Sequence, residues 1–208
     1  MPNATPFEEH TDTYEAWFDE YDAVYESELN AIDQLLGDGR ALEVGVGSGR
    51  FGAPLGIDVG VDPAGEMLQL ARQRGIDVVR GVAEQLPFEE NTFETVLLVT
   101  TICFVDDIPA TLAQARRVLD SDGAILIGYV DRHSPVGEIY EEHKAENPFY
   151  RDATFVSTDR LRDELLDAGF TDLETVQTVF QWIDEIDEPE PVKPGHGDGS
   201  FVVIKAHR

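Results

Sequence analysis

The chain has 208 residues, of which 42% are hydrophobic, and its 42 acidic and 15 basic side chains give a formal net charge of −27. This length suits one domain with a sizeable buried core. Because binding to phosphate-rich surfaces needs clustered positive charge, the composition argues against nucleic acid and against an acidic membrane surface as partners.

We interpret the excess of acidic residues as adaptation to a halophilic cytoplasm, in which salt screens the self-repulsion of the fold. Melting curves from low to multimolar KCl test this interpretation, and unchanged stability would contradict it. Cys103 is the one cysteine, so no intramolecular disulfide can form. Because the sequence shows neither a signal peptide nor an apolar run of membrane-spanning length, we expect a cytoplasmic location.

The N-terminal part of the chain reads as a polar stretch followed by a helical region. Residues 1–11 are expected to lack regular structure. From 12 to 36, aromatic and apolar residues recur at spacings of three and four, which predicts one amphipathic cap helix or two helices with a break. The glycines at 37 and 39 end this region.

Strands and helices then alternate along the chain. Predicted strands cover residues 40–44, 57–61, 77–80, 95–99, 124–130, 172–180 and 201–206, a turn or short helix covers 50–55, and predicted helices cover 64–74, 108–119 and 158–168. A turn is expected at 120–123, and the polar loop 184–200 is the predicted flexible element. The pattern predicts an α/β Rossmann-like, doubly wound, seven-stranded, mostly parallel sheet with a C-terminal antiparallel hairpin. The free edge of that hairpin would allow a homodimer to form.

We therefore expect a single domain over residues 1–208. Within it, 12–36 forms the cap helix region, 40–130 the ligand-binding core, and 158–208 a helix with the C-terminal hairpin. The segment 131–157 contains Tyr140, Lys144, Phe149 and Tyr150 and is predicted to be a substrate lid, with a solvated helix as the alternative.

A glycine-rich turn follows the first strand. The run from Gly47 to Gly52 matches G-x-G-x-x-G, which by itself suggests NAD(P). A dinucleotide site needs an acid about 20 residues further on, after a helix. Here Asp62 comes only 15 residues after Gly47, and Pro54 and Gly56 leave almost no room for that helix.

A second register, Glu43-x-Gly45-x-Gly47-x-Gly49, fits better and resembles the first motif of class I S-adenosylmethionine-dependent methyltransferases. Further segments resemble later motifs of that family in the same order: Asp62 after the second strand, 83–88 after the third, 94–100 at the fourth and 117–124 before the fifth. The resemblance covers residues 40–130. The run 100–107 (TTICFVDD) and the glycine-rich start of the last strand resemble small archaeal and thermophile-type methyltransferases of the ubiquinone/menaquinone-biosynthesis-like branch.

The resemblance implies S-adenosyl-L-methionine as the cofactor and a set of residues that bind it. Asp62 would hold both ribose hydroxyls, because each carboxylate oxygen can accept one hydrogen bond. Glu43 would steer the ammonium group of the cofactor directly or through water. Because Val82 stands where many relatives have an acid, the adenine amine would need Glu84 or a backbone carbonyl. The full predicted set is Glu43, Gly45, Gly47, Gly49, Asp62, Pro63, Met67, Ala83, Glu84 and Thr100; for Met67, a core position is the alternative.

The predicted substrate pocket comprises Tyr14, Trp17, Phe104 and His133. Tyr14 and Trp17 could instead belong only to the buried stripe of the cap helix, and His133 is either a general base or a surface residue. Cys103 is expected in the pocket wall. The histidines lack metal-ligand spacing, so no metal is assigned.

The predicted reaction is methyl transfer to a small-molecule acceptor by in-line displacement. No catalytic residue is named, because an amine or thiol acceptor can lose its proton to water. The alternatives are a non-catalytic S-adenosylmethionine-binding module and an NAD(P)-dependent reductase.

Overall fold

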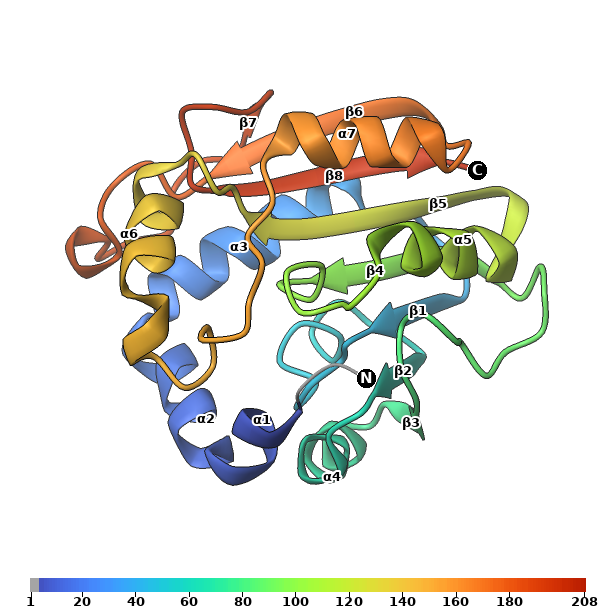
Figure 1. The fold of residues 1–208 in the computed structure, drawn as a ribbon, viewed down its shortest axis with the longest axis horizontal. Helices are drawn as coiled ribbons and strands as arrows, with labels where there is room; N and C mark the ends of the chain where they lie inside the picture. The colour runs from blue at the N-terminus through green and yellow to red at the C-terminus, as the bar shows by residue number, and fades with distance from the viewer. Residues whose placement is uncertain (1–3) are drawn as a thin grey trace.

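The computed structural model describes residues 4–208 and contains an eight-stranded mixed sheet with helices on both faces (Figure 1). The strand order is β3-β2-β1-β4-β5-β8-β6-β7. The strands are β1 (Ala41–Val44), β2 (Val59–Asp62), β3 (Asp77–Arg80), β4 (Phe93–Val99), β5 (Leu119–Val130), β6 (Thr171–Thr178), β7 (Lys193–Pro194) and β8 (Phe201–His207). Strands β1 to β5 are parallel, and β8 pairs antiparallel with both β5 and β6.

The Rossmann-like α/β prediction is confirmed, with a correction in the number of strands. The eighth strand is β7, a two-residue strand paired with β6 inside the loop predicted at 184–200. The late strands β6 and β8 pair antiparallel at this end of the sheet, as predicted, with β8 between β5 and β6. This order follows from the antiparallel return of β8, which pairs with residues 124–130 of β5.

The apolar strands are buried because helices cover both faces of the sheet. In β4, Val96 and Leu98 pack into one core cluster while Leu97 and Val99 pack into the other, as the two-residue period of a strand requires. Helices α5 (Ile108–Val118) and α7 (Thr158–Asp167) cover the first face, and α3 (Asp22–Leu35) covers the second. Helix α4 (Gly65–Gln73) packs beside β2 and β3.

The N-terminal region differs from its prediction. The stretch expected to lack structure contains α1 (Thr5–Glu9), because Phe7 packs with its ring centroid 5.3 Å from those of both Phe104 and Phe149. The cap region consists of two helices, α2 (Thr11–Glu20) and α3, which is the second of the two predicted arrangements. The break falls at Tyr21, whose backbone leaves the helical region at φ −116° and ψ 48°.

The structure also tests the predictions for two short segments, residues 50–55 and 120–123. Residues 50–55 form a series of turns without a helix. The turn predicted at 120–123 is wrong, since β5 already begins at Leu119 and pairs there with Phe93 across an irregularity in β4. The strand continues through these residues because Leu119 pairs with Phe93 before them and Ala124 pairs with Thr95 after them, while residues 120–123 form the irregularity between the two pairs.

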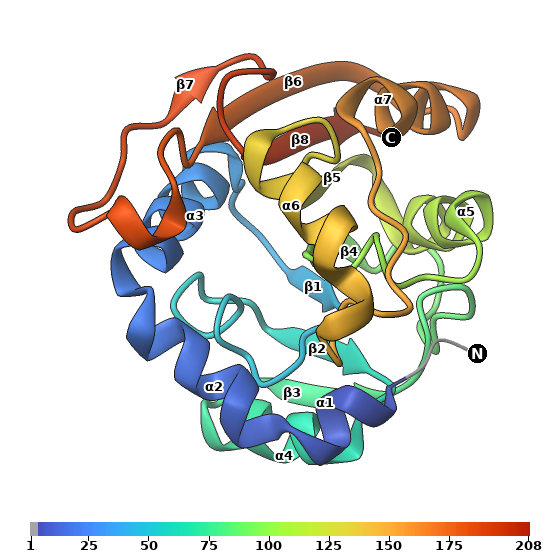
Figure 2. The same ribbon diagram turned by 60° about the vertical axis from the view of Figure 1, so that its left-hand side comes forward.

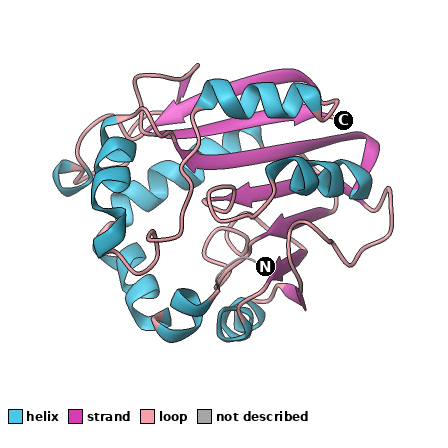
Figure 3. Cartoon of the chain, in the orientation of Figure 1, coloured by secondary structure: helices cyan, strands magenta, loops and turns pink. Residues whose placement is uncertain are grey.

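The carboxyl ends of the parallel strands face a group of helices that are far apart in sequence (Figure 2). These are α1, α2, α3 and α6 (Pro135–His143), the last followed by the short 3-10 helix η1 (Lys144–Glu146). A second 3-10 helix, η2 (Ile183–Glu185), lies in the loop after β6. Figure 3 shows the loops after β1 and β4 between these helices and the sheet. Among the described residues, no helix has the length and apolar character needed to cross a bilayer.

Candidate active site

A cavity of about 430 Å³ lies at the carboxyl ends of the parallel strands. This position is where open α/β sheets bind their ligands. The loops after β1, β2, β3 and β4 form one side of it, and the N-terminal helices together with the segment after β5 form the other. Of the predicted site residues, ten line the cavity: Tyr14, Trp17, Gly45, Gly47, Asp62, Pro63, Met67, Ala83, Thr100 and Phe104.

The glycine loop after β1 needs its glycines for steric reasons. Gly45, Gly47 and Gly49 have φ angles of +75°, +51° and +82°, a region that side chains other than hydrogen rarely adopt. A Cβ at Gly45 would overlap the side chain of Thr101, and one at Gly49 would lie 2.9 Å from Ile76 Cδ1. Gly49 itself packs against the protein interior and does not line the cavity.

Asp62 connects the end of β2 to the glycine loop. Its Oδ2 accepts a hydrogen bond from the backbone N–H of Gly47 (2.9 Å), and its Oδ1 accepts one from Ala64 (2.8 Å). Burial raises the pKa of this carboxyl although both hydrogen bonds oppose the shift. Since each oxygen retains a further acceptor position, a vicinal diol at the cavity wall can still be bound by both.

Glu43 lies beneath the glycine loop and not in the cavity wall. It is 1% exposed, and its Oε2 has no hydrogen-bond partner among the described residues. Burial, and then the nearby charge of Asp62, raise its pKa well above the ordinary value, which the backbone N–H of Gly52 only partly offsets. A buried polar atom without a partner is uncommon in a folded protein.

Besides Glu43 and Gly49, two further predicted site residues lie outside the cavity wall. Glu84 accepts hydrogen bonds at Oε1 from the backbone N–H groups of Asp106 (2.8 Å) and Asp107 (3.4 Å), so it connects the loop after β3 to the start of α5. His133 is exposed and does not line the cavity. Met67 is 1% exposed, as expected of a core residue, and it also lines the cavity, as expected of a residue near the ligand.

The segment predicted as a lid supplies aromatic residues to the cavity. Tyr140, Phe149 and Tyr150 line it, and the rings of Tyr140 and Tyr150 stack with centroids 4.8 Å apart. Lys144 does not line the cavity, because its Nζ donates to Glu141 (3.0 Å) and to the Ala153 carbonyl (3.3 Å). This half of the cavity is therefore walled mainly by aromatic rings.

Two cavity groups are held neutral by their surroundings. Burial, together with the charges of Glu43 and Asp62, raises the pKa of Tyr14, so its hydroxyl stays protonated. Burial raises the pKa of Cys103 to about 12, and its thiol donates to the Thr100 carbonyl. A neutral thiol is a poor nucleophile, so Cys103 acts as a wall of the cavity, as expected. Within residues 4–208, no group of three potential ligands is arranged to hold a metal ion.

The sequence prediction missed Glu28. This residue lies in α3, lines the cavity and is 6% exposed. Burial alone raises its pKa to about 8. A signal was present in the sequence, because Glu28 occupies the same helical stripe as Val24 and Ile32, where an acid is unusual.

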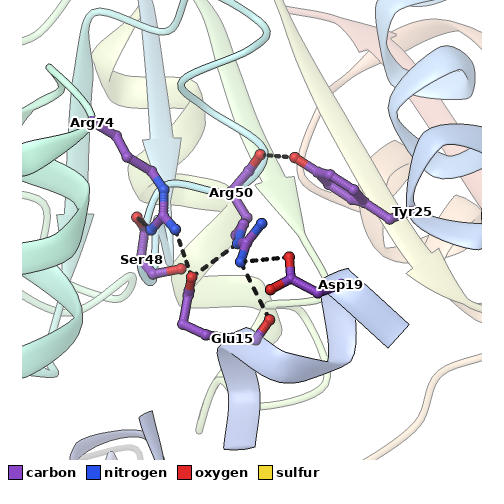
Figure 4. Close-up of polar contacts among 6 residues, drawn as sticks. All are labelled: Glu15, Asp19, Tyr25, Ser48, Arg50 and Arg74. Atoms are coloured by element: carbon purple, nitrogen blue, oxygen red, sulfur yellow. Dashed lines mark hydrogen bonds and ion pairs between the residues drawn. The ribbon is translucent and has the colours of Figure 1, made fainter. Parts of the chain in front are cut away.

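A charged network holds α2 against the glycine loop (Figure 4). Glu15 Oε2 accepts from Arg50 Nε (2.9 Å) and from Arg74 Nη2 (2.5 Å), and Arg74 also donates to the Ser48 carbonyl (2.6 Å). Burial would raise the pKa of Glu15, but the adjacent Ser48 hydroxyl and both arginines outweigh it and lower the pKa below its ordinary value. The network therefore fixes the helix that carries Tyr14 and Trp17 over the cavity.

We expect Glu15→Gln to destabilise the fold by about 1–2 kcal/mol, since it removes a partly buried ionic partner of two arginines. The lowered pKa means that this contribution is present above the ordinary pKa of 4.5 and is lost as the pH falls through the lower, folded-state value. Chemical denaturation at pH 7 measures the difference, and faster amide exchange in α2 should accompany it. Glu20→Gln, an exposed acid of the same helix, is the control; equal effects of both variants would contradict the prediction.

Comparisons with known proteins identify the family to which this chain belongs. Residues 42–127 match the methyltransferase domain family. An uncharacterized protein from Methanocaldococcus jannaschii is 40% identical over 202 residues, which cover 97% of this chain and 98% of that protein. One from Mycobacterium tuberculosis is 35% identical over 176 residues, covering 82% of this chain and 61% of the relative.

Among solved structures, a SAM-dependent methyltransferase from Thermotoga maritima, named as a possible histamine N-methyltransferase, is 45% identical with a TM-score of 0.96. The match covers 98% of this chain and 99% of that one. The chain therefore belongs to the S-adenosylmethionine-dependent methyltransferases. Membership of this family favours methyl transfer over the alternative of an NAD(P)-dependent reductase, and it implies S-adenosylmethionine as the cofactor.

Proposed function

We propose that this enzyme methylates a small-molecule acceptor that binds in the aromatic half of the cavity. The observation that carries the proposal is that one continuous cavity joins the glycine loop and Asp62 to the aromatic residues of α2 and the segment after β5. A volume of about 430 Å³ lies in the range of small-molecule sites. The Thermotoga maritima structure is named as a possible histamine N-methyltransferase, and histamine is a small molecule, which supports an acceptor of similar size here.

The residues present fit the cofactor that the family implies. Asp62 offers acceptor oxygens for the ribose hydroxyls, the loop from Gly45 to Gly47 presents backbone instead of side chains, and the unpaired Oε2 of Glu43 lies beneath that loop. S-adenosylmethionine supplies a methyl group already activated on a sulfonium sulfur. The protein's own contribution is then to orient the acceptor and to exclude water from the cavity.

The finer predictions about this enzyme stay proposals. Membership of the ubiquinone/menaquinone-biosynthesis-like branch rests on the resemblance of residues 100–107 and the start of β8. The absence of nucleic acid and membrane partners rests on the net charge of −27. The acidic surface supports a salt-rich cytoplasm, and the edge of the sheet at β7 is where a homodimer would pair.

We expect S-adenosylhomocysteine to bind with a dissociation constant in the micromolar range or below, measured by isothermal titration. Incubation of the enzyme and S-adenosylmethionine with a metabolite extract should then release S-adenosylhomocysteine and yield a methylated compound of low molecular mass. Binding without turnover on any extract would favour the non-catalytic module. Absence of binding at millimolar ligand would overturn the proposal.

A further inference from the structure

Glu28 is a buried acid with no assigned task in cofactor binding. It is 6% exposed, lies on the apolar face of α3 and contributes to the cavity wall. Its carboxylate forms no hydrogen bond or ion pair with the residues the structure describes, and its oxygens are not among the enclosed polar atoms that lack a partner, so they stay accessible from the cavity. Burying a carboxylate without a partner is costly, so a residue of this kind is expected to have a partner that the protein chain does not supply.

The charges around the cavity restrict what that partner can be. The described residues that line it include two acids, Glu28 and Asp62, and no lysine, arginine or histidine. Asp62 is committed to the glycine loop at the opposite side. An acceptor carrying a carboxylate or a phosphate would therefore meet a negative group and find no basic side chain in the wall.

The groups near Glu28 favour a cation. Its charge acts on Tyr14 of α2, on Tyr140 of α6 and on Tyr150, and burial keeps the pKa of all three raised, so that they are neutral aromatic rings. Trp17 and Tyr21 also line the cavity. Aromatic faces attract ammonium groups, and the attraction grows when the site is desolvated. An ion pair with an ammonium also offsets the burial of the carboxylate, which a neutral hydroxyl does less well.

We propose that the methyl acceptor is an amine, that Glu28 binds its ammonium group within the aromatic wall, and that Glu28 takes the proton that frees the nitrogen lone pair. This inference rests on the proposed function, because it names the substrate class of the same cavity. It assigns Glu28 as a catalytic residue and leaves the cofactor residues as described.

The proton and electron balance is complete with these groups. An N–H bond of the ammonium breaks, its proton goes to the carboxylate oxygen of Glu28, and the bonding pair stays on nitrogen. That pair forms the bond to the methyl carbon of S-adenosylmethionine, while the pair of the breaking C–S bond stays on sulfur. The product leaves as an N-methylammonium ion, and the carboxyl of Glu28 returns its proton to water.

The acid–base properties of Glu28 agree with this task. Burial raises its pKa to about 8, near the pH at which the enzyme would work. A proton acceptor is most effective when its pKa lies close to the working pH. A bound ammonium would favour the ionised form, so the pair can share one proton between carboxylate and nitrogen.

The test measures the binding of four amines and their matched alcohols to the enzyme saturated with S-adenosylhomocysteine. The pairs are n-butylamine and 1-butanol, benzylamine and benzyl alcohol, 2-phenylethylamine and 2-phenylethanol, and tryptamine and tryptophol. We expect at least one amine to bind about tenfold or more tightly than its alcohol. Glu28→Gln should weaken the binding of that amine by about 10- to 100-fold and leave the binding of the matched alcohol unchanged.

Two controls separate the inference from the proposed function. Glu26→Gln, an exposed acid of the same helix, should leave every affinity unchanged, and all variants should bind S-adenosylhomocysteine like the native enzyme. With the preferred amine as substrate, Glu28→Gln should lower kcat by about 100-fold or more. If no amine is preferred, or if Glu28→Gln keeps the preference, the inference is wrong while methyl transfer stands. If S-adenosylhomocysteine does not bind, the proposed function fails first.

Discussion

Replacing Asp62 with alanine should weaken the binding of S-adenosylhomocysteine by about 100-fold. The substitution removes the acceptor of two backbone N–H groups, those of Gly47 and Ala64, and with it the oxygens offered to the ribose hydroxyls. Isothermal titration measures the effect. Loss of affinity should exceed any loss of folding stability, since the glycine loop also retains the hydrogen bond from Gly45 N–H to the Val61 carbonyl (2.7 Å).

A matched control comes from the opposite end of the same strand. Asp58 Oδ2 accepts a hydrogen bond from the backbone N–H of Ala41 (3.0 Å), far from the cavity wall. Asp58→Ala therefore also removes an acceptor of a backbone N–H, but it should leave the affinity for S-adenosylhomocysteine unchanged. Equal losses for both variants would show that Asp62 acts only through the stability of β2.

Replacing Glu28 with glutamine should stabilise the folded protein increasingly as the pH rises. The pKa of Glu28 is about 8 in the folded state and near its ordinary value of 4.5 when the chain is unfolded. Below pH 4.5 the group is protonated in both states, so the native and variant proteins should have similar stability. Between pH 4.5 and about 8, the native protein loses on the order of 1.4 kcal/mol per pH unit through this group, because only the unfolded state ionises.

Chemical denaturation of both proteins at pH 5, 6, 7 and 8 and constant ionic strength tests this expectation. The difference between them isolates Glu28 from the other acids of the chain, and Glu26→Gln should show no comparable trend. A constant difference across these pH values would contradict the prediction. The same substitution is expected to abolish the preference for amines, so Glu28 would be a residue at which function is retained at the expense of stability.

Much of the cofactor side could be predicted because it depends on local sequence. Strands buried on both faces read as apolar runs, and a run that ends in glycine marks the turn at the carboxyl end. In a parallel sheet these ends meet at one edge, so the order of Gly45, Asp62, Ala83 and Thr100 along the chain was sufficient to bring them to one cavity.

The exceptions show where local reasoning failed. Glu84 and His133 follow the correct strands, yet Glu84 is bound to the loop before α5 and His133 is exposed. Helix α1 forms in a polar stretch because Phe7 meets Phe104 and Phe149, contacts that span about half of the chain or more. No periodicity near residue 7 indicates such partners.

The sequence by itself predicted the α/β fold class and the glycine-rich turn after the first strand, since both follow from hydrophobic period and backbone conformation, and the resemblance to class I methyltransferases added Asp62. Only the tertiary structure decided which side chains meet at the acceptor half of the cavity. Glu28 occupies an apolar stripe that could have packed on the sheet or faced solvent, and it lines the cavity together with Tyr140 and Tyr150, which are more than 100 residues away in the chain. The physical reason is that burial and charge compensation depend on neighbours from distant elements, whereas strand and turn formation depend on neighbours in sequence.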